Sequence, residues 1–171
     1  MAFDFNQWWA KLQELYPNAE ILDVSMAKRA IKLRIPFLDL VVYFKRVLRD
    51  GGVPDAKVGI KPCSNEIPNS QCIIVNSFSN NLTDLRKYFP DVMLTQKELG
   101  EDRVLYIAKI PKDTFSAYVE NAWRQSVKGM HIGLGFKTYK QVEYLYITLY
   151  LGEPPKETID KVQTDEVSSD E

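Results

Sequence analysis

Residues 129–152 read GMHIGLGFKTYKQVEYLYITLYLG, and this stretch decides the fold. Along residues 142–151, two sets of side chains alternate. One set is aliphatic (Leu145, Ile147, Leu149 and Leu151), and the other is mostly tyrosine (Tyr144, Tyr146, Thr148 and Tyr150). Because the side chains of a strand alternate with a period of 2, this pattern predicts a strand with an aliphatic face and a tyrosine face. Residues 130–139 alternate in the same way, so the two segments form a predicted β-hairpin.

A two-residue turn at residues 140–141 sets the register of the predicted hairpin. It places Phe136 opposite Leu145 on the aliphatic face and Gly135 opposite Tyr146 on the tyrosine face. A slip of one residue would turn every aliphatic side chain to the wrong face, which favours this register. Glycines within a strand often mark the close approach of a ligand or of another backbone. On this face they leave space beside the tyrosines.

The rest of the chain repeats one pattern, in which a helix is followed by two strands. Helices are predicted over residues 4–16, 36–50, 82–88 and 114–127, and strands over residues 20–26, 28–35, 57–60, 72–78, 92–95 and 103–110, with a loop at 97–102. Most connections between strands are of hairpin length. We therefore expect an α+β fold with a largely antiparallel sheet built of helix-hairpin units, and with the helices mainly on one face.

Charge divides the chain into a mildly basic body and an acidic tail. The whole chain of 171 residues has a net charge of −1. Residues 153–171 hold seven acids and two lysines, whereas residues 1–152 have a net charge of +4. With two prolines and almost no large apolar side chain, residues 153–171 are predicted to be disordered. Residues 1–152 are predicted to form a single domain.

The chain has few residues that are suited to catalysis or to metal binding. Cys63 and Cys72 cannot form a metal site by themselves. We expect them to be free buried thiols, since nothing suggests secretion, although a disulfide is possible. The one histidine, His131, has no spacing that joins it to a nucleophile and an orienting acid. We therefore expect a protein that is not an enzyme, with no catalytic residue, no metal and no cofactor.

Short motifs and targeting signals add no function. GLGF at residues 133–136 resembles the carboxylate-binding loop of PDZ domains, but four residues are too few to imply that family. The same segment lacks the third glycine and the following helix of a dinucleotide loop. The N-terminal MAFDFNQWW has no apolar core of a signal peptide, and no apolar run approaches the roughly 20 residues of a membrane span. We expect a cytoplasmic protein, or a nuclear one in a eukaryote, with no membrane partner.

The tyrosine face favours binding to single-stranded nucleic acid. RNA-binding sheets stack bases on aromatic side chains and hold phosphates with cations. The strongest basic cluster, residues 28–49, has seven basic residues and one acid, Asp39. We therefore predict a non-catalytic subunit or accessory factor of a nucleoprotein assembly, which contacts RNA or single-stranded DNA. Its predicted contacts are Lys32, Arg34, Lys45, Arg46, Arg49, Lys137, Tyr139, Lys140, Tyr144, Tyr146 and Tyr150.

The alternative is a protein–protein adaptor, inhibitor or assembly factor that has no contact with nucleic acid. Aromatic residues and arginine anchor many protein interfaces. Trp8 and Trp9 in the N-terminal helix would then form the partner-binding patch. A helix packed over Gly133 and Gly135 would close the tyrosine face to a ligand. The sequence leaves both interpretations open, and protein partners are expected under either one.

Overall fold

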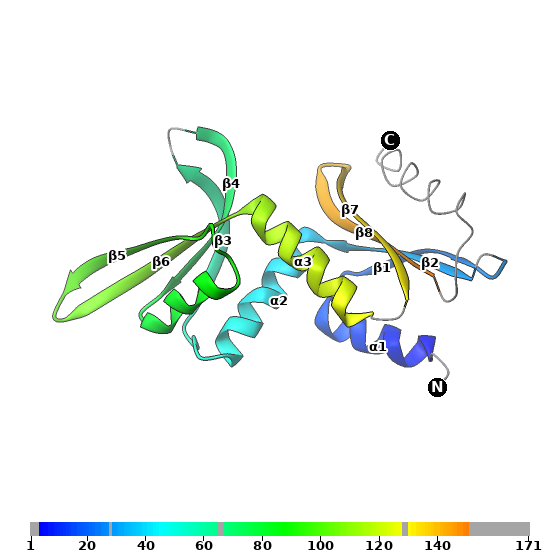
Figure 1. Cartoon of the computed structure of the whole chain (residues 1–171), viewed down its shortest axis with the longest axis horizontal. Helices are drawn as coiled ribbons and strands as arrows, with labels where there is room; N and C mark the ends of the chain where they lie inside the picture. Colours follow the sequence, from blue (N-terminus) through cyan, green and yellow to red (C-terminus); the bar gives the residue numbers. More distant parts are fainter. Residues whose placement is uncertain (1–3, 28, 65–66, 128–129, 151–171) are drawn as a thin grey trace. The chain divides into compact units, whose positions relative to one another are not determined.

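The computed structural model describes residues 4–27, 29–64, 67–127 and 130–150. As predicted, the chain is α+β, and each of its four hairpins follows a helix in the described sequence (Figure 1). The helices are α1 (Phe5–Leu15), α2 (Phe37–Asp50), the 3-10 helix η1 (Asn80–Lys87) and α3 (Lys112–Ser126). The strands are β1 (Glu20–Ser25), β2 (Ala30–Pro36), β3 (Lys57–Ser64), β4 (Ile67–Ser77), β5 (Met93–Gly100), β6 (Arg103–Pro111), β7 (His131–Tyr139) and β8 (Val142–Tyr150). In these ranges, no helix is both long enough and apolar enough to cross a membrane.

The chain forms two compact units, and each has its own four-stranded antiparallel sheet. The first unit comprises Met1–Leu40 with Ala122–Glu171 and holds sheet A, in which the strand order is β1-β2-β8-β7. The second unit comprises Val41–Asn121 and holds sheet B, in which the order is β3-β4-β6-β5. The predicted acidic tail at residues 153–171 lies outside the described residues.

Sheet A confirms the predicted register of the β7–β8 hairpin. Phe136 pairs with Leu145, and Gly135 pairs with Tyr146. Lys140 and Gln141 have φ values of 49° and 69°. Positive φ at both central residues is the geometry of the type I′ turn, whose twist matches that of the strands it joins. The alternation of side chains therefore specified the pairing even without a favoured Asn-Gly turn.

The aliphatic face of sheet A is the core of the first unit. Its central side chains are at most 1% exposed (Ile31, Leu33, Ile35, Leu145, Ile147 and Leu149). Buried side chains of α1 and of the adjoining helix ends complete this core (Leu12, Tyr16, Phe37, Leu40 and Trp123). The Phe37 ring lies edge-on to Phe136 with a centroid distance of 5.9 Å, and Tyr16 stacks on Trp123 at 6.3 Å. Burying each such side chain contributes about 1.5–3 kcal/mol, so this face fixes the orientation of the other.

Asp39 joins the loop that follows α1 to the first turn of α2. The backbone amide of Asn18 donates to Asp39 Oδ2 at 2.7 Å, and its side-chain amide donates to Oδ1 at 2.9 Å. The carboxylate is 7% exposed. The single acid of the basic cluster at residues 28–49 therefore has a structural role, because it holds this loop.

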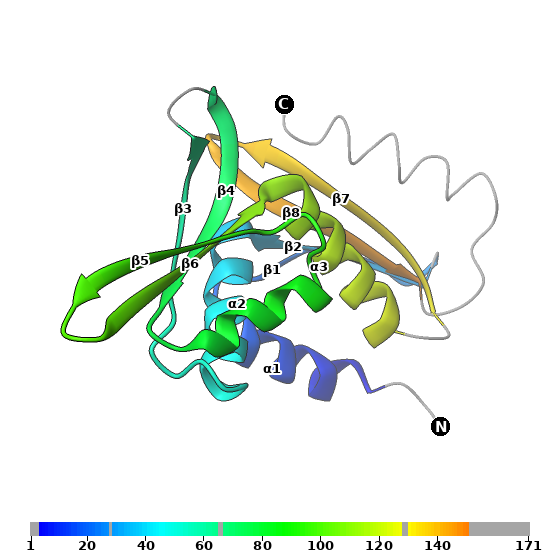
Figure 2. The same cartoon turned by 60° about the vertical axis from the view of Figure 1, so that its left-hand side comes forward.

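The inner face of sheet B is the core of the second unit. Ile73, Val75, Ala108 and Ile110 are fully buried on it. Leu82 and Leu85 of η1 are also buried, and Phe44, Phe89 and Phe115 pack ring to ring with centroids 5.2–6.5 Å apart. The tip of the β5–β6 hairpin extends past η1 (Figures 1 and 2).

Strands β3, β4 and β5 of sheet B are longer than the sequence predicted. The short strand expected at residues 57–60 is the eight-residue β3, which includes Pro62. β3 is an edge strand, where a proline costs no ladder hydrogen bond. The loop expected at residues 97–102 is also wrong, because β5 and β6 continue to a two-residue turn at Glu101 and Asp102, with φ values of 54° and 60°. The exposed polar side chains of β5 hid this strand from a search for apolar periodicity.

The expectation of free thiols is corrected by the structure. Cys63 and Cys72 form a disulfide, with their Cα atoms 4.9 Å apart. The pairing of β3 with β4 brings the two residues together, since Lys61 lies opposite Cys72 and the register shifts just beyond it. The described residues contain no free cysteine. The absence of a secretion signal therefore did not predict the redox state of Cys63 and Cys72.

Candidate nucleic-acid interface

The register of sheet A brings basic residues of β2 beside the tyrosines of β8. Residues directly opposite each other in an antiparallel pair lie on the same face. One row across the tyrosine face is therefore Gly135, Tyr146, Arg34 and Glu20, and the next is Gly133, Thr148, Lys32 and Asp23. Lys137 lies opposite Tyr144 near the turn, and His131 lies opposite Tyr150 at the other end. The structure thus places Lys32 and Arg34, together with Lys137, on the tyrosine face.

The guanidinium of Arg34 lies among three tyrosines and one glutamate. Arg34 Nε donates to Glu20 Oε2 at 2.6 Å, and Nη1 donates to the Tyr146 hydroxyl at 3.5 Å. Its central carbon is 4.3 Å from the ring centroid of Tyr144 and 5.0 Å from that of Tyr139. A cation within about 6 Å of a ring centroid is attracted by the ring's quadrupole. These contacts hold Arg34 and two ring faces in one fixed arrangement.

Arg34 remains positively charged in this environment. Burial alone would lower the pKa of its guanidinium, but the hydrogen bonds to Tyr146 and Glu20 and the charge of Glu20 outweigh burial and raise that pKa above its usual value. Glu20 neutralises much of this charge locally, since it lies within direct ion-pair distance. Sequence analysis missed Glu20, although the predicted pairing of strands 20–26 and 28–35 could have indicated it.

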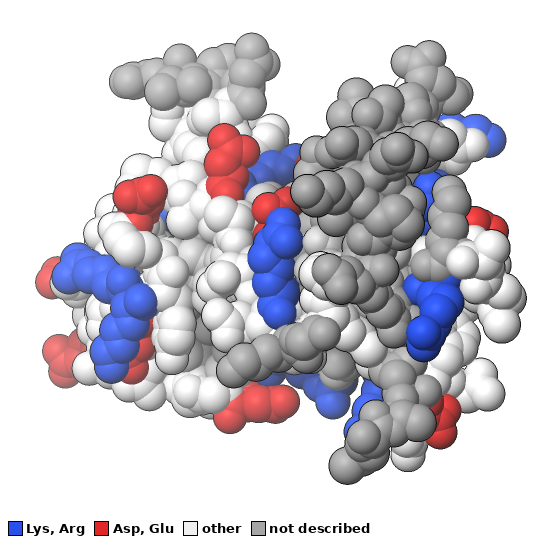
Figure 3. Space-filling view, turned by 45° about the vertical axis from the view of Figure 1, so that its right-hand side comes forward, with Lys and Arg blue, Asp and Glu red and all other residues white. Residues whose placement is uncertain are grey.

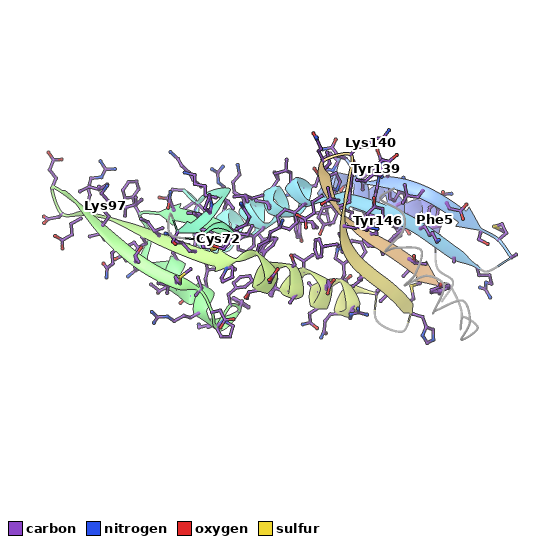
Figure 4. All side chains as sticks on the ribbon, turned by 90° about the horizontal axis from the view of Figure 1, so that it is seen from above. Phe5, Cys72, Lys97, Tyr139, Lys140 and Tyr146 are labelled. Atoms are coloured by element: carbon purple, nitrogen blue, oxygen red, sulfur yellow. A yellow bond between two sulfur atoms is a disulfide. The ribbon has the colours of Figure 1, made fainter. Side chains whose placement is uncertain are left out.

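The two ends of the tyrosine face differ in exposure. Tyr146, Thr148 and Tyr150 are only 5%, 2% and 3% exposed. Tyr139, Tyr144 and Lys137 are half-buried, and Lys140 is exposed. Tyr139 and Lys140 lie at the turn of the β7–β8 hairpin, whereas Tyr146 lies further along β8 (Figure 4). The accessible part, here called the hairpin-end cluster, consists of Arg34, Lys137, Tyr139, Lys140 and Tyr144.

Cations and rings alternate within the hairpin-end cluster. The Nζ atom of Lys140 lies 5.3 Å from the ring centroid of Tyr139. Lys137 flanks Tyr144 across the strand pair. The Tyr144 and Tyr146 rings are 6.0 Å apart at an interplanar angle of 57°, so the buried Tyr146 supports the accessible Tyr144. This arrangement offers partly exposed rings together with two lysines.

Three predicted phosphate contacts belong to the other unit. Lys45, Arg46 and Arg49 lie on the part of α2 that follows Val41, so they are not part of the hairpin-end cluster. Arg49 Nε donates to the carbonyl of Ala56 at 3.0 Å. On the face drawn in Figure 3, Lys and Arg side chains stand in small groups, and Asp and Glu side chains lie beside several of them.

The two N-terminal tryptophans are neither fully buried nor fully exposed. Trp8 and Trp9 are half-buried on α1. Asp4 caps the start of this helix, because its carboxylate accepts a hydrogen bond from the backbone amide of Gln7 at 3.1 Å. The Trp8 ring lies 6.1 Å from that of Phe5, which Figure 4 labels. Part of each indole therefore remains available to a partner.

The described side chains offer no cluster suited to metal binding. Among residues 4–27, 29–64, 67–127 and 130–150, no three His, Cys, Asp or Glu residues lie together so that they could hold a metal ion. Cys63 and Cys72 are joined to each other, so neither supplies a thiolate. His131 is exposed near the start of β7.

The chain is similar to a viral protein. It is 26% identical over 141 residues to "Uncharacterized protein ORF217a" of Acidianus filamentous virus 2 (isolate Italy/Pozzuoli). The match covers 78% of this chain but 58% of the viral protein, so the chain spans little more than half of that relative's length. No protein-family model matches the chain, and no solved structure matches it. This similarity brings no binding or catalytic function with it.

Proposed function

We propose that the protein is a non-catalytic component of a nucleoprotein assembly, and that it contacts RNA or single-stranded DNA through the hairpin-end cluster. The observation that carries this proposal is the fixed arrangement of Arg34 against the rings of Tyr139 and Tyr144, with Lys137 and Lys140 beside it. Single-stranded nucleic acid needs both elements, because aromatic rings stack its bases and cations hold its phosphates.

Burial narrows the proposed contacts. Tyr146 and Tyr150 have almost no exposed surface, so they are not expected to contact a base directly. Tyr139 and Tyr144 are the rings on which a base could stack. Glu20 pairs with Arg34, and Lys137 and Lys140 are the further cations of this cluster that could contact phosphates. The body's charge of +4 is modest, so we expect weak binding by the isolated protein.

The test is oligonucleotide binding measured by fluorescence anisotropy with Tyr144→Leu and Tyr139→Leu. Stacking on one ring contributes about 1–3 kcal/mol per base, so each change should weaken binding by roughly 5- to 150-fold. Tyr144→Phe keeps the ring and should bind as the wild type does. Tyr88→Leu is the matched control, because Tyr88 is an exposed tyrosine (60%) in the other unit.

Charge removal tests the phosphate contacts separately. The double change Lys137→Gln with Lys140→Gln should lower affinity and flatten its dependence on salt. A triple change at Lys45, Arg46 and Arg49 tests the predicted contribution of α2 in the same way. If the wild-type chain without residues 153–171 binds no oligonucleotide at low salt, the proposed function is wrong.

The alternative function, as a protein–protein adaptor, inhibitor or assembly factor, is favoured by exposed apolar residues of sheet A. The edge strand β1 and the residue after it expose four of them (Ile21 37%, Leu22 44%, Val24 49% and Met26 84%). Exposed apolar patches of this kind mark protein contacts. Affinity capture with and without nuclease distinguishes the two functions. A partner that remains after nuclease treatment and is lost with Leu22→Ser and Val24→Thr supports the adaptor.

A further inference from the structure

The outer face of sheet B has a composition unlike that of its buried inner face. The pairing of β3, β4, β5 and β6 places on it the residues that alternate with the core. Its basic residues are Lys57, Lys61, Lys97, Arg103 and Lys109. Its apolar residues are Ile74, Met93, Leu105 and Ile107, and Phe78 adjoins them after the end of β4. No Asp or Glu occurs among the described strand residues on this face.

This face is accessible over most of its area. Lys57, Lys61, Lys97 and Arg103 are exposed, and Ile74, Leu105, Ile107 and Lys109 are half-buried. Phe78 and Met93 are 46% and 43% exposed. By contrast, the alternating residues Ile73, Val75, Ala108 and Ile110 are fully buried. The inner face therefore forms the core of this unit, and the accessible outer face could bind a ligand.

Gly59 leaves an open position near the middle of β3. It pairs with Ile74, and a Cβ atom built on Gly59 would meet no atom within 4 Å. The backbone of a strand glycine can be approached closely by a ligand. Lys57 and Lys61 flank this position on the same strand. The rise of about 3.4 Å per residue separates them by roughly 14 Å, so they can reach different phosphates.

Phe78 and Arg103 form a cation–π pair at the other side of the face. The guanidinium carbon of Arg103 lies 4.5 Å from the Phe78 ring centroid. Arg34 on sheet A pairs with Glu20, whereas Arg103 lies opposite Gly100 in the β5–β6 pair. A guanidinium plane held flat on a ring is a surface on which an unpaired base can stack.

We propose that the outer face of sheet B is a second nucleic-acid contact, and that its ligand is a single strand. Five cations without a carboxylate complement a polyanion. The apolar side chains between these cations would face only phosphates and sugars in a duplex, whereas a single strand can lay its bases on them. An acidic peptide would satisfy the lysines but would leave the apolar strip and the Phe78–Arg103 pair unused.

The test compares two sets of charge changes in the full chain. The outer-face variant carries Lys57→Gln, Lys61→Gln and Lys97→Gln. The control variant carries Lys11→Gln, Lys87→Gln and Arg124→Gln, which are exposed residues on helices. Binding of a labelled single strand of about 20 nucleotides, longer than the roughly 4–16 nucleotides of a typical site, is measured by anisotropy at several salt concentrations.

We expect the outer-face variant to lose three phosphate contacts. At about 0.7 released counterions per contact, the slope of log affinity against log salt should fall by about 2. The control variant should keep its slope. If both variants change alike, or neither does, the inference is wrong. Gly59→Leu adds bulk at an open position without changing charge, so it should fold as the wild type does and bind more weakly.

A footprint on the unaltered chain gives a second readout. The oligonucleotide should protect Lys57, Lys61 and Lys97 from acetylation, while Lys11 and Lys87 should react equally with and without it. Competition by poly-glutamate as strong as that by the oligonucleotide would identify an acidic-peptide site and overturn the inference. The inference does not depend on the hairpin-end cluster. If Tyr144→Leu loses binding and the outer-face variant does not, the hairpin-end cluster is supported as the contact and the outer face of sheet B is refuted.

Discussion

Removal of the Cys63–Cys72 disulfide should destabilise sheet B by an amount that follows from the chain. The two residues are 9 positions apart, so the bond closes a loop of about ten residues. In the chain-entropy model, such a loop stabilises the native state by about 2.7 kcal/mol at 25 °C, because it restricts the unfolded chain. A change of this size lowers the Tm of a unit of about 80 residues by roughly 10–20 °C.

Hydrogen exchange is the assay that locates this effect. Amides of β3 and β4 should exchange about 100-fold faster in Cys63→Ala/Cys72→Ala, since 1.4 kcal/mol corresponds to a factor of ten. Wild-type protein treated with a reductant should behave in the same way. All three tryptophans lie in the first unit, so their fluorescence reports sheet A separately.

Three results would refute this reasoning. Thiol titration of the denatured, unreduced protein could detect two free cysteines, which would mean that the bond does not form. Alternatively, verified reduction could leave the exchange of β3 and β4 unchanged, which would mean that the paired strands restrict the loop without the bond. A shift confined to the tryptophan transition would also place the effect in the wrong unit.

Three further predictions concern the cation cluster, a carboxylate and the tail. A double-mutant cycle with Arg34→Gln and Tyr144→Leu should give a coupling of about 0.5–1 kcal/mol in denaturant unfolding, and a coupling near zero would exclude the ring contact. The hydrogen bond from Ser77, and then that from the Phe78 amide, lowers the pKa of Asp55 below 3.8. The stability lost in Asp55→Asn should therefore be greatest above pH 4 and should shrink as the pH falls further; a loss independent of pH would contradict this. Deleting residues 153–171 removes a net charge of −5, so oligonucleotide affinity should rise at about 50 mM salt and rise less at about 200 mM. If the truncated chain and the full-length chain bind with equal affinity at each salt concentration, shielding by the tail is excluded.

The β7–β8 hairpin could be predicted almost completely because its sequence has two independent signals. Aliphatic residues alternate with tyrosines in β8, and a second alternation in β7 matches it about one turn. Each signal alone leaves the register open, but only one register satisfies both. The pairing of Arg34 with Tyr146 could not be predicted in this way, because β2 lies more than 100 residues before β8 and nothing local links the two.

Sheet B shows the opposite case. Its strands β3 and β5 lie at the two edges and carry exposed polar side chains, so neither has the apolar alternation that identifies a half-buried strand. Pro62 and the acidic turn at Glu101 and Asp102 look like loop signals in the sequence. The strands exist because the central pair, β4 and β6, supplies hydrogen-bond partners on each outer side. Tertiary pairing, which a local pattern does not contain, therefore decided their length.

The exposure of the side chains distinguishes the two proposed nucleic-acid contacts, the hairpin-end cluster and the outer face of sheet B. Tyr144 and Tyr146 occupy the same face two residues apart, yet Tyr144 is half-buried and Tyr146 is 5% exposed. On that face, Arg34 pairs with Glu20, and Lys137 and Lys140 lie near the turn. The outer face of sheet B has five cations and no carboxylate among its described strand residues. Per lysine removed, the outer-face changes should therefore reduce the salt dependence of binding more than Lys137→Gln with Lys140→Gln does. The reverse order would make the hairpin end the principal contact with phosphates.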